Sequence, residues 1–473
     1  MVSTVSSAPQ SSSDQASSRQ YLAKVSAQTS PNQSLLPLSA AVNDKDHLTV
    51  GGCDVVDLIE EFGSPLYILD EQTLRTACRQ YKQAFERHYP GESLIVYASK
   101  AWNCLAVCAI ATQEGIAIDV VSGGELQTAV AAGAKGKMLY FHGNNKSAAE
   151  LKLGLAADAR VVVDNWHELE TLNQLAKDAG KTVTILLRLT PGIECHTHEY
   201  IQTGHIDSKF GFDPDQLEEV FDFISKQTSH INCIGLHAHI GSQIFELQPH
   251  RDLADVMMRW FQTASQYGIT IQEIDIGGGL GIRYTESDDP PSIDEWAQTV
   301  CESMVAACKA KDLPLPKLLC EPGRSMVGSA CVTAYTVGGQ KTVPGIRTYI
   351  SVDGGMSDNP RPITYESVYR ILAASKMSAP LSETVTVAGK HCESGDVVIH
   401  SASLPKLAAG EVLAVPATGA YNYSMSSNYN RVPRPAAVIV NEGRADLILR
   451  RETYEDLVRH DCLPAALKPT SSS

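Results

Sequence analysis

The 473-residue sequence lacks the features that mark several large classes of protein. No run approaches the roughly 18 uninterrupted apolar residues of a membrane-spanning helix. The 12 cysteines include no C-x-x-C pair and form no dense framework, which favours a reducing cytosol over secretion. There is no basic run, and acidic residues outnumber basic ones by 54 to 39, so nucleic acid is not an expected partner. We therefore expect a soluble, cytoplasmic protein.

The N-terminal stretch has few large apolar groups. Residues 1–44 are rich in Ser, Gln and Ala, so they bury too little surface to offset the entropy of ordering and are predicted to be a disordered tail. The stretch has no apolar segment of the secretory type. Its serine content is compatible with a transit peptide, which leaves plastid import open if the source is a plant.

Between Ser93 and Arg324, short apolar runs alternate eight times with helix-like stretches. Continuous Val, Ile and Leu are typical of parallel strands buried on both faces. Polar residues stand at the ends of these runs, and in a (β/α)8 barrel the loops after the strands carry the chemistry, so their side chains should converge on one pocket. These residues are Lys100, Asp119, His142, Arg188, His239, Gly277 to Gly279 and Glu321. The pattern favours an enzyme.

The remaining length indicates a second domain, because a barrel takes about 250 residues. After Arg324 the sequence changes to β-branched runs divided by Gly, Pro and Asn turns. Residues 46–70 read strand, helix, strand and are expected to complete that domain. The predicted fold is α/β. It combines a (β/α)8 TIM-like barrel over residues 73–325 with a second, mainly antiparallel β-sandwich or barrel domain over 45–72 and 326–473.

Lys100 and the triple glycine suggest a site in which an amine attacks a carbonyl group and backbone N–H groups bind a phosphate. In a mostly buried pocket, the pKa of Lys100 should be lowered, which makes its amine a usable nucleophile. A lysine that extends its ammonium group into solvent is the alternative. Gly277 to Gly279 follow the seventh run, and backbone N–H groups after strands seven and eight commonly hold a phosphate in barrels.

His237, His239 and Glu321 leave more than one interpretation open. The two histidines share one face of the sixth run, because side chains alternate along a strand. They could begin a metal site, contact a phosphate together with Gly241 and Ser242, or simply pack in the core. A buried Glu321 needs a partner, either a protonated ring nitrogen of a ligand or a cationic side chain.

Seven segments, in order along the chain, resemble a known family. They are YASKA around Lys100, HAHIGSQ, GGGLG, CEPGR, DGGMSDNPRPITY, CESGD and GAYNYSMSSNYN. The set resembles the pyridoxal-phosphate-dependent decarboxylases of the alanine-racemase-like barrel fold, and among them the diaminopimelate decarboxylases, which catalyse the last step of lysine biosynthesis. The resemblance covers about residues 46–465. It implies pyridoxal 5'-phosphate as cofactor, no metal, meso-diaminopimelate as substrate, and a homodimer with shared active sites.

The resemblance also implies roles for individual residues around the cofactor. Lys100 would hold the cofactor covalently, His239 would stack on its ring, and Glu321 would face its ring nitrogen. Its phosphate would be held by Gly241, Ser242, Gly277, Gly278, Gly279, Gly323, Arg324 and Tyr421. Racemases of this fold place an arginine near the ring nitrogen, so a glutamate there favours decarboxylation.

Further roles concern the substrate and the partner subunit. The far carboxylate would meet Arg324, Arg361 and Tyr365, with Tyr421 also contacting the substrate, because Arg presents a planar fork to carboxylates. Cys392 would return a proton to Cα, and Glu393 would bind the far ammonium group. In the family this segment reaches into the other subunit's site. Both residues would thus act in trans.

Three alternatives accompany this interpretation. A metal-dependent barrel hydrolase would need further His or Asp ligands at other strand ends. A non-catalytic pyridoxal-phosphate carrier would lack the long β domain, and a sibling decarboxylase would act on arginine, ornithine or carboxynorspermidine. No definite role is assigned to Asp119, Arg188 or His142. The histidines of the loop before Lys209 are expected to form a solvated cluster rather than a metal site: His196, His198 and His205.

Overall fold

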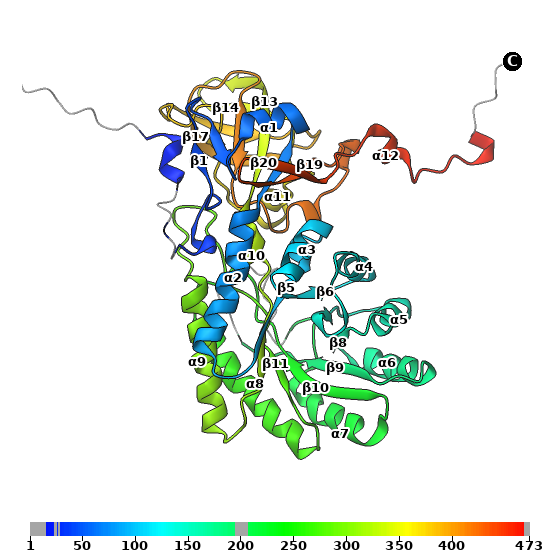
Figure 1. Cartoon of the computed structure of the whole chain (residues 1–473). Helices are drawn as coiled ribbons and strands as arrows, with labels where there is room; N and C mark the ends of the chain where they lie inside the picture. Colours follow the sequence, from blue (N-terminus) through cyan, green and yellow to red (C-terminus); the bar gives the residue numbers. More distant parts are fainter. Residues whose placement is uncertain (1–15, 23–25, 27–28, 194–206, 468–473) are drawn as a thin grey trace, which may run out of the picture.

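The computed structural model describes residues 16–22, 26, 29–193 and 207–467. It contains a closed parallel barrel of eight strands and a separate mixed sheet, which lie at opposite ends of the molecule in Figure 1. The predicted fold class is confirmed. Within the described residues, no helix combines the length and the apolar character needed to cross a membrane.

The barrel strands pair in parallel in chain order, and β12 closes the ring against β5. The strands are β5 (Ser93–Ala98), β6 (Ala117–Val120), β7 (Leu139–Phe141), β8 (Arg160–Val163), β9 (Val183–Arg188), β10 (Ile231–His237), β11 (Glu273–Asp275) and β12 (Lys317–Cys320). Most of their residues are buried, as expected of parallel strands that are covered on both faces.

Helices surround the barrel on its outer side (Figure 1). They are α2 (Glu71–His88), α3 (Leu105–Gln113), α4 (Gly123–Ala131), α5 (Ala148–Ala156), α6 (Trp166–Asp178), α7 (Leu217–Gln227), α8 (Gln248–Gln266) and α9 (Ile293–Ala310). Polar caps fix where several begin. Ser147 with Glu150 and Ser292 with Glu295 form complete capping boxes on α5 and α9.

The barrel interior is closed at the amino-terminal ends of its strands. Glu273, the first residue of β11, pairs with Arg160 at 2.9 Å and with Lys317 at 3.4 Å, and both cations also begin barrel strands. The Tyr140 hydroxyl donates to the same carboxylate at 3.1 Å. Ion pairs fill this end of the barrel, and apolar side chains fill the interior next to it. The cavity described below therefore lies at the opposite, carboxyl-terminal end of the strands.

The second domain is built on two central strands that lead directly to and from the barrel. β4 (Leu66–Asp70) precedes α2 and pairs antiparallel with β13 (Cys331–Val343). Most strand pairs of the second domain are antiparallel, but the pairs β4–β19 and β14–β16 are parallel. The other strands are β14 (Arg347–Val352), β15 (Leu372–Ala373), β16 (Glu383–Ala388), β17 (Val397–Leu404), β18 (Val412–Val415), β19 (Ala436–Asn441) and β20 (Arg444–Leu449).

Shorter elements flank this domain. They are α1 (Val55–Phe62), a small sheet of β1 (Ala41–Val42), β2 (Leu48–Val50) and β3 (Cys53–Asp54), and the short helices α10 (Arg324–Val327), α11 (Arg361–Tyr365) and α12 (Tyr454–Val458). Two of the short helices carry predicted site residues. Arg324 begins α10 and Arg361 begins α11, so both guanidinium groups are placed where the two domains meet the cavity.

The prediction of a disordered tail is wrong for residues 29–44. Asn32 is fully buried, and its side-chain amide donates to the carbonyl oxygens of Gly281 and Pro291 at 3.1 and 2.9 Å. Leu36 is buried in a hydrophobic cluster of the second domain. The average composition is misleading here, because a few leucines and one well-satisfied amide are enough to fix a segment against a preformed surface.

Candidate active site

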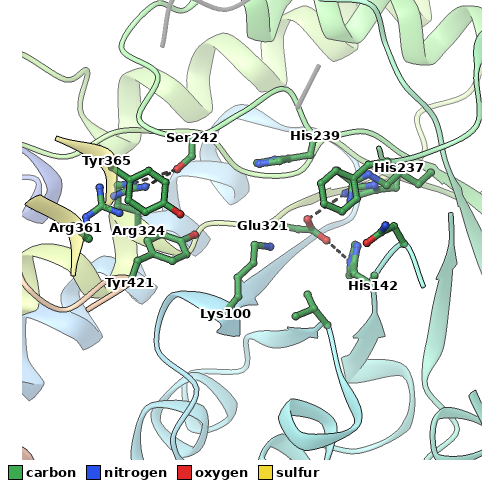
Figure 2. A pocket seen from close by; sticks show the side chains of 15 residues that line it. Lys100, His142, His237, His239, Ser242, Glu321, Arg324, Arg361, Tyr365 and Tyr421 are labelled. Atoms are coloured by element: carbon green, nitrogen blue, oxygen red, sulfur yellow. Dashed lines mark hydrogen bonds and ion pairs between the residues drawn. The ribbon is translucent and has the colours of Figure 1, made fainter. Parts of the chain in front are cut away.

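A cavity of about 380 Å³ lies at the carboxyl-terminal ends of the barrel strands. Residues after the barrel strands form most of its wall, and the second domain contributes Arg361, Tyr365 and Tyr421 (Figure 2). The lining residues are Lys100, Val121, His142, Gly143, Asn144, Arg188, Phe210, His237, His239, Ser242, Glu321, Arg324, Arg361, Tyr365 and Tyr421. Eight predicted site residues thus meet in one cavity.

Lys100 follows β5 in a 3-10 turn, Ser99–Ala101, and its side chain extends into the cavity (Figure 2). Its Nζ donates to Asp119 Oδ2 at 2.9 Å, and Asp119 itself is fully buried. Burial alone would lower the pKa of Lys100, but the charges of Asp119 and Glu321 raise it above its ordinary value. The predicted lowering is therefore wrong. Asp119 holds the amine in the cavity as an ammonium group.

Glu321 directly follows β12, and each of its carboxylate oxygens meets a histidine (Figure 2). Oε1 lies 2.6 Å from His142 Nε2, and Oε2 lies 3.2 Å from His237 Nε2. Burial would raise the pKa of Glu321, but the two histidines lower it well below its usual range. Burial lowers the pKa of His237 to about 4, so its uncharged ring donates Nε2–H to the carboxylate.

Asp275, the last residue of β11, is a second carboxyl group in the same cluster. One ligand-type atom from each of His142, His237, Asp275 and Glu321 lies within 4.8 Å of the others, and all four residues are buried. Burial and the adjacent Glu321 raise the pKa of Asp275 well above its usual range. Two buried carboxyl groups this close are not both ionised, and the opposite pKa shifts place the proton on Asp275 and the negative charge on Glu321.

His239 lines the cavity between Ser242 and His237 and is held by the glycine loop (Figure 2). The Gly278 N–H donates to His239 Nδ1 at 3.2 Å. A Cβ on Gly277 would lie 2.6 Å from that same nitrogen, and one on Gly278 would lie 2.3 Å from the Glu321 carbonyl oxygen. The glycines are therefore required for close packing of three strand ends. Burial lowers the pKa of His239 well below its usual range, so the ring facing the cavity is uncharged.

The opposite end of the cavity is cationic. Arg324 and Arg361 are only 4% and 6% exposed. Arg324 donates to Ser242 Oγ at 3.0 Å and to the Tyr284 hydroxyl at 2.6 Å, and Arg361 donates to a serine hydroxyl. Within the described part of the chain, neither guanidinium forms an ion pair with a carboxylate. The rings of Tyr284, Tyr365 and Tyr421 surround them. This end of the cavity can therefore accept an anion.

Arg188 and the loop after β7 complete the wall. Arg188 lies 4.0 Å from Asp164 and over the Phe210 ring at 4.2 Å. Lys146 is buried beside Glu168 at 2.8 Å and donates to the Gly143 carbonyl oxygen at 2.7 Å. These contacts fix the loop that carries His142. The strand end at β8, with Asp164, had not been singled out from the sequence.

Not every predicted site residue reaches the cavity. Cys392 and Glu393 are exposed on the turn between β16 and β17 and are not among the residues that line it. Their action in trans stays a prediction. Five predicted glycines lie in loops that adjoin lining residues and do not line the cavity themselves: Gly241, Gly277, Gly278, Gly279 and Gly323. His196, His198 and His205 lie outside the described residues.

Comparison with known proteins places this geometry in a family. The pyridoxal-binding domain model of the pyridoxal-dependent decarboxylases matches residues 71–328. A diaminopimelate decarboxylase from a Synechocystis species is 62% identical over 454 residues, which is 94% of this chain and 97% of that protein. The chain belongs to the diaminopimelate decarboxylase family. Its cofactor is pyridoxal phosphate.

Solved structures agree with this assignment. A diaminopimelate decarboxylase from M. jannaschii has a TM-score of 0.85 at 33% identity, covering 91% of this chain and 99% of that one. A co-complex of the M. jannaschii protein with L-lysine has the same TM-score at 32% identity, covering 93% and 100%. The hydrolase alternative is excluded by family membership, although the further strand-end ligands that it required, His142 and Asp275, are present beside His237.

The residues of the decarboxylase cavity fit pyridoxal phosphate chemically. An aldehyde requires an amine, which Lys100 provides inside the cavity. A protonated pyridine nitrogen requires a buried anion, which Glu321 provides because Asp275 carries the proton of the pair. A phosphate requires donors, and the buried Arg324, which donates to Ser242 Oγ, forms no ion pair with a carboxylate among the described residues. The neutral ring of His239 offers a flat surface between these groups.

Proposed function

We propose that the chain decarboxylates meso-2,6-diaminopimelate at its D centre and releases L-lysine and CO2, the last step of lysine biosynthesis. The proposal rests on one observation above all. Arg324 and Arg361 are two buried cations without a carboxylate partner in the described part of the chain, at the end of the cavity opposite Glu321. The complex of the M. jannaschii relative with L-lysine supports it.

The two buried guanidinium groups require two anions. An unpaired buried charge costs several kcal/mol, and this cost is offset only when a ligand brings the counter-charge. The cofactor phosphate would take one place, beside Ser242 and Arg324. The far carboxylate of the substrate would take the other, with Arg361 and Tyr365. Ornithine lacks a far carboxylate, so it would leave one of these charges unpaired.

The reaction uses the charges already described. When bound, pyridoxal phosphate supplies a conjugated ring that accepts the electron pair left as CO2 departs. The anionic Glu321 would hold a proton on the ring nitrogen, and His142 with His237 would keep this carboxylate in place. The Lys100 amine would bind the cofactor and give way to the substrate amine. His239 would keep the ring flat against the cavity wall.

A proton must then reach Cα. None of the described residues that line the cavity is a cysteine, and Cys392 is exposed outside the cavity of its own chain. We propose that Cys392 and Glu393 act in the cavity of a second copy, in a homodimer. Cys392 would donate the proton, and Glu393 would bind the far ammonium group. We also propose a cytoplasmic location, consistent with free cysteines throughout the described residues.

Replacing Arg361 tests the substrate assignment. Arg361→Gln removes the guanidinium but keeps a hydrogen-bond donor near Ser367. We expect kcat/KM for meso-diaminopimelate to fall about a hundredfold, mostly through KM, because a charge-assisted contact is worth about 3 kcal/mol. Steady-state kinetics with a coupled lysine assay would measure this loss.

The matched control is Arg444→Gln, which removes an exposed arginine on β20. This control should leave both kinetic constants within about twofold of the parent. The visible absorbance of the bound cofactor should be unchanged in both variants. An unchanged KM in Arg361→Gln would remove Arg361 from the substrate site.

A further inference from the structure

A buried histidine–aspartate pair lies beside the turn that carries Cys392. His391 Nδ1 is 2.7 Å from Asp396 Oδ2, and the two side chains are 0% and 2% exposed. Between them in the chain, Cys392, Glu393 and the next two residues are exposed. The contact between His391 and Asp396 therefore joins the two ends of the turn, and the residues between them are exposed.

The Asp396 carboxylate also gathers the backbone around it. It accepts from the N–H of His391 at 2.9 Å and from the N–H of Met356 at 2.7 Å. A Cβ on Gly389 or Gly355 would lie 2.1 or 2.4 Å from this carboxylate, so glycine is required at both places. Asp396 thus joins the Cys392 turn to the loop that follows β14.

A second set of contacts holds the same turn from another loop. The Cys392 N–H donates to Asn430 Oδ1 at 2.7 Å. Asn430 has a φ of +55°, a conformation that asparagine tolerates better than most residues. The His391 ring stacks on Tyr429, with centroids 6.1 Å apart and planes 23° from parallel. His391 therefore connects Asp396 on one side with the 421–431 loop on the other.

We propose that His391 and Asp396 are positioning residues that set the place of the Cys392 thiol for proton delivery. This inference rests on the proposed function. In the step concerned, the electron pair released when the bond to CO2 breaks takes the thiol proton and forms the Cα–H bond. The thiolate left behind regains a proton from water. His391 and Asp396 touch neither the substrate nor the reacting atoms, and they act through the turn.

Two substitutions at His391 separate positioning from simple packing. His391→Asn keeps a side-chain N–H close to the Nδ1 position and so can still donate to Asp396. His391→Phe keeps an aromatic ring against Tyr429 and loses the donor, which leaves the buried Asp396 carboxylate short of one bond. The exposed His400 on β17 provides the control His400→Phe.

The main measurement is the number of lysine molecules formed for each CO2 released from meso-diaminopimelate. If the Cys392 thiol is out of place, it does not deliver its proton to Cα after CO2 leaves. The proton is then added at an atom other than Cα, and lysine is not formed. We expect His391→Phe to lower the lysine-to-CO2 ratio below one and kcat by about tenfold or more, with KM within about twofold. His391→Asn and His400→Phe should keep a ratio of one.

Amide hydrogen exchange of residues 389–396 gives a readout independent of catalysis. It should accelerate in His391→Phe and stay near the parent rate in His391→Asn, in each case in the cofactor-bound protein. Equal losses in both His391 variants, or a ratio of one in His391→Phe, would overturn the proposal. If His391→Phe does not fold, His391→Asn provides the test. The proposal requires this variant to keep the hydrogen-exchange rate of the parent and a lysine-to-CO2 ratio of one, and failure of either would overturn it.

Cys392→Ala distinguishes failure of this inference from failure of the proposed function. A lowered lysine-to-CO2 ratio in Cys392→Ala together with a ratio of one in His391→Phe would leave the acid role of Cys392 in place and remove the positioning role of His391. A ratio of one in Cys392→Ala at full kcat would remove the acid role itself.

Discussion

Lys100→Ala is expected to abolish turnover and the visible absorbance of the lysine-bound cofactor together. Lys100 supplies the amine that lines the cavity beside Asp119, and none of the other described lining residues is a lysine. The phosphate and ring contacts would remain, so the variant should still bind the cofactor, but reversibly. We expect kcat to fall about a thousandfold or more, which corresponds to about 4 kcal/mol of barrier.

Absorbance spectra before and after gel filtration check this expectation. The parent should retain its colour, whereas Lys100→Ala should lose it. Lys152→Ala, which removes an exposed lysine on α5, is the control and should behave as the parent does. A Lys100→Ala protein that keeps both colour and turnover would show that another amine holds the cofactor.

The second large effect is expected at Glu321, whose replacement should lower kcat far more than replacement of Asp275, the other carboxyl group of the cluster. Glu321 carries the charge and Asp275 the proton, since their pKa values are shifted down and up respectively. Glu321→Gln removes the anion that would hold the ring nitrogen protonated. We expect kcat to fall about a hundredfold, from a contact worth ~3 kcal/mol. Asp275→Asn replaces a neutral group by another of the same shape, so kcat should fall by less than about fivefold.

The comparison of these two variants needs the cofactor to be bound in both. The visible absorbance should persist in each, because Lys100 is intact, and thermal unfolding should show a folded protein. Glu302→Gln, an exposed change on α9, controls for the loss of charge alone. Equal losses in Glu321→Gln and Asp275→Asn would mean that the two carboxyl groups share their charge and that the assigned proton is misplaced.

The barrel could be predicted from the sequence because parallel strands leave a local signature. Apolar runs such as LIVYA and TILLRL end in residues that do not belong in a core, and the structure places Lys100 and Arg188 at the cavity as that pattern indicates. The resemblance also predicted that Arg361 and Tyr365, far along the chain, contribute to the same site as Glu321. The structure brings all three to one cavity.

The contacts between residues at the ends of different strands could not be predicted from the sequence in the same way. His142 follows β7 and meets Glu321 after β12, and nothing local in either segment encodes that approach. The same holds for Lys100 and Asp119, whose ion pair reverses the expected pKa shift of the lysine. Asp275 was visible within EIDIGGG, but its proton-holding role depends on the distance to Glu321. Barrel closure and register set such distances, and periodicity does not report them.

The most direct test of the proposed decarboxylation is CO2 release by the cofactor-loaded protein. meso-Diaminopimelate, ornithine and arginine would be supplied separately, with lysine measured in the same samples. The account predicts one lysine per CO2 from meso-diaminopimelate, and kcat/KM values for ornithine and arginine at least about a hundredfold lower, because each leaves a buried guanidinium group unpaired. Turnover of ornithine equal to or better than that of meso-diaminopimelate would contradict it.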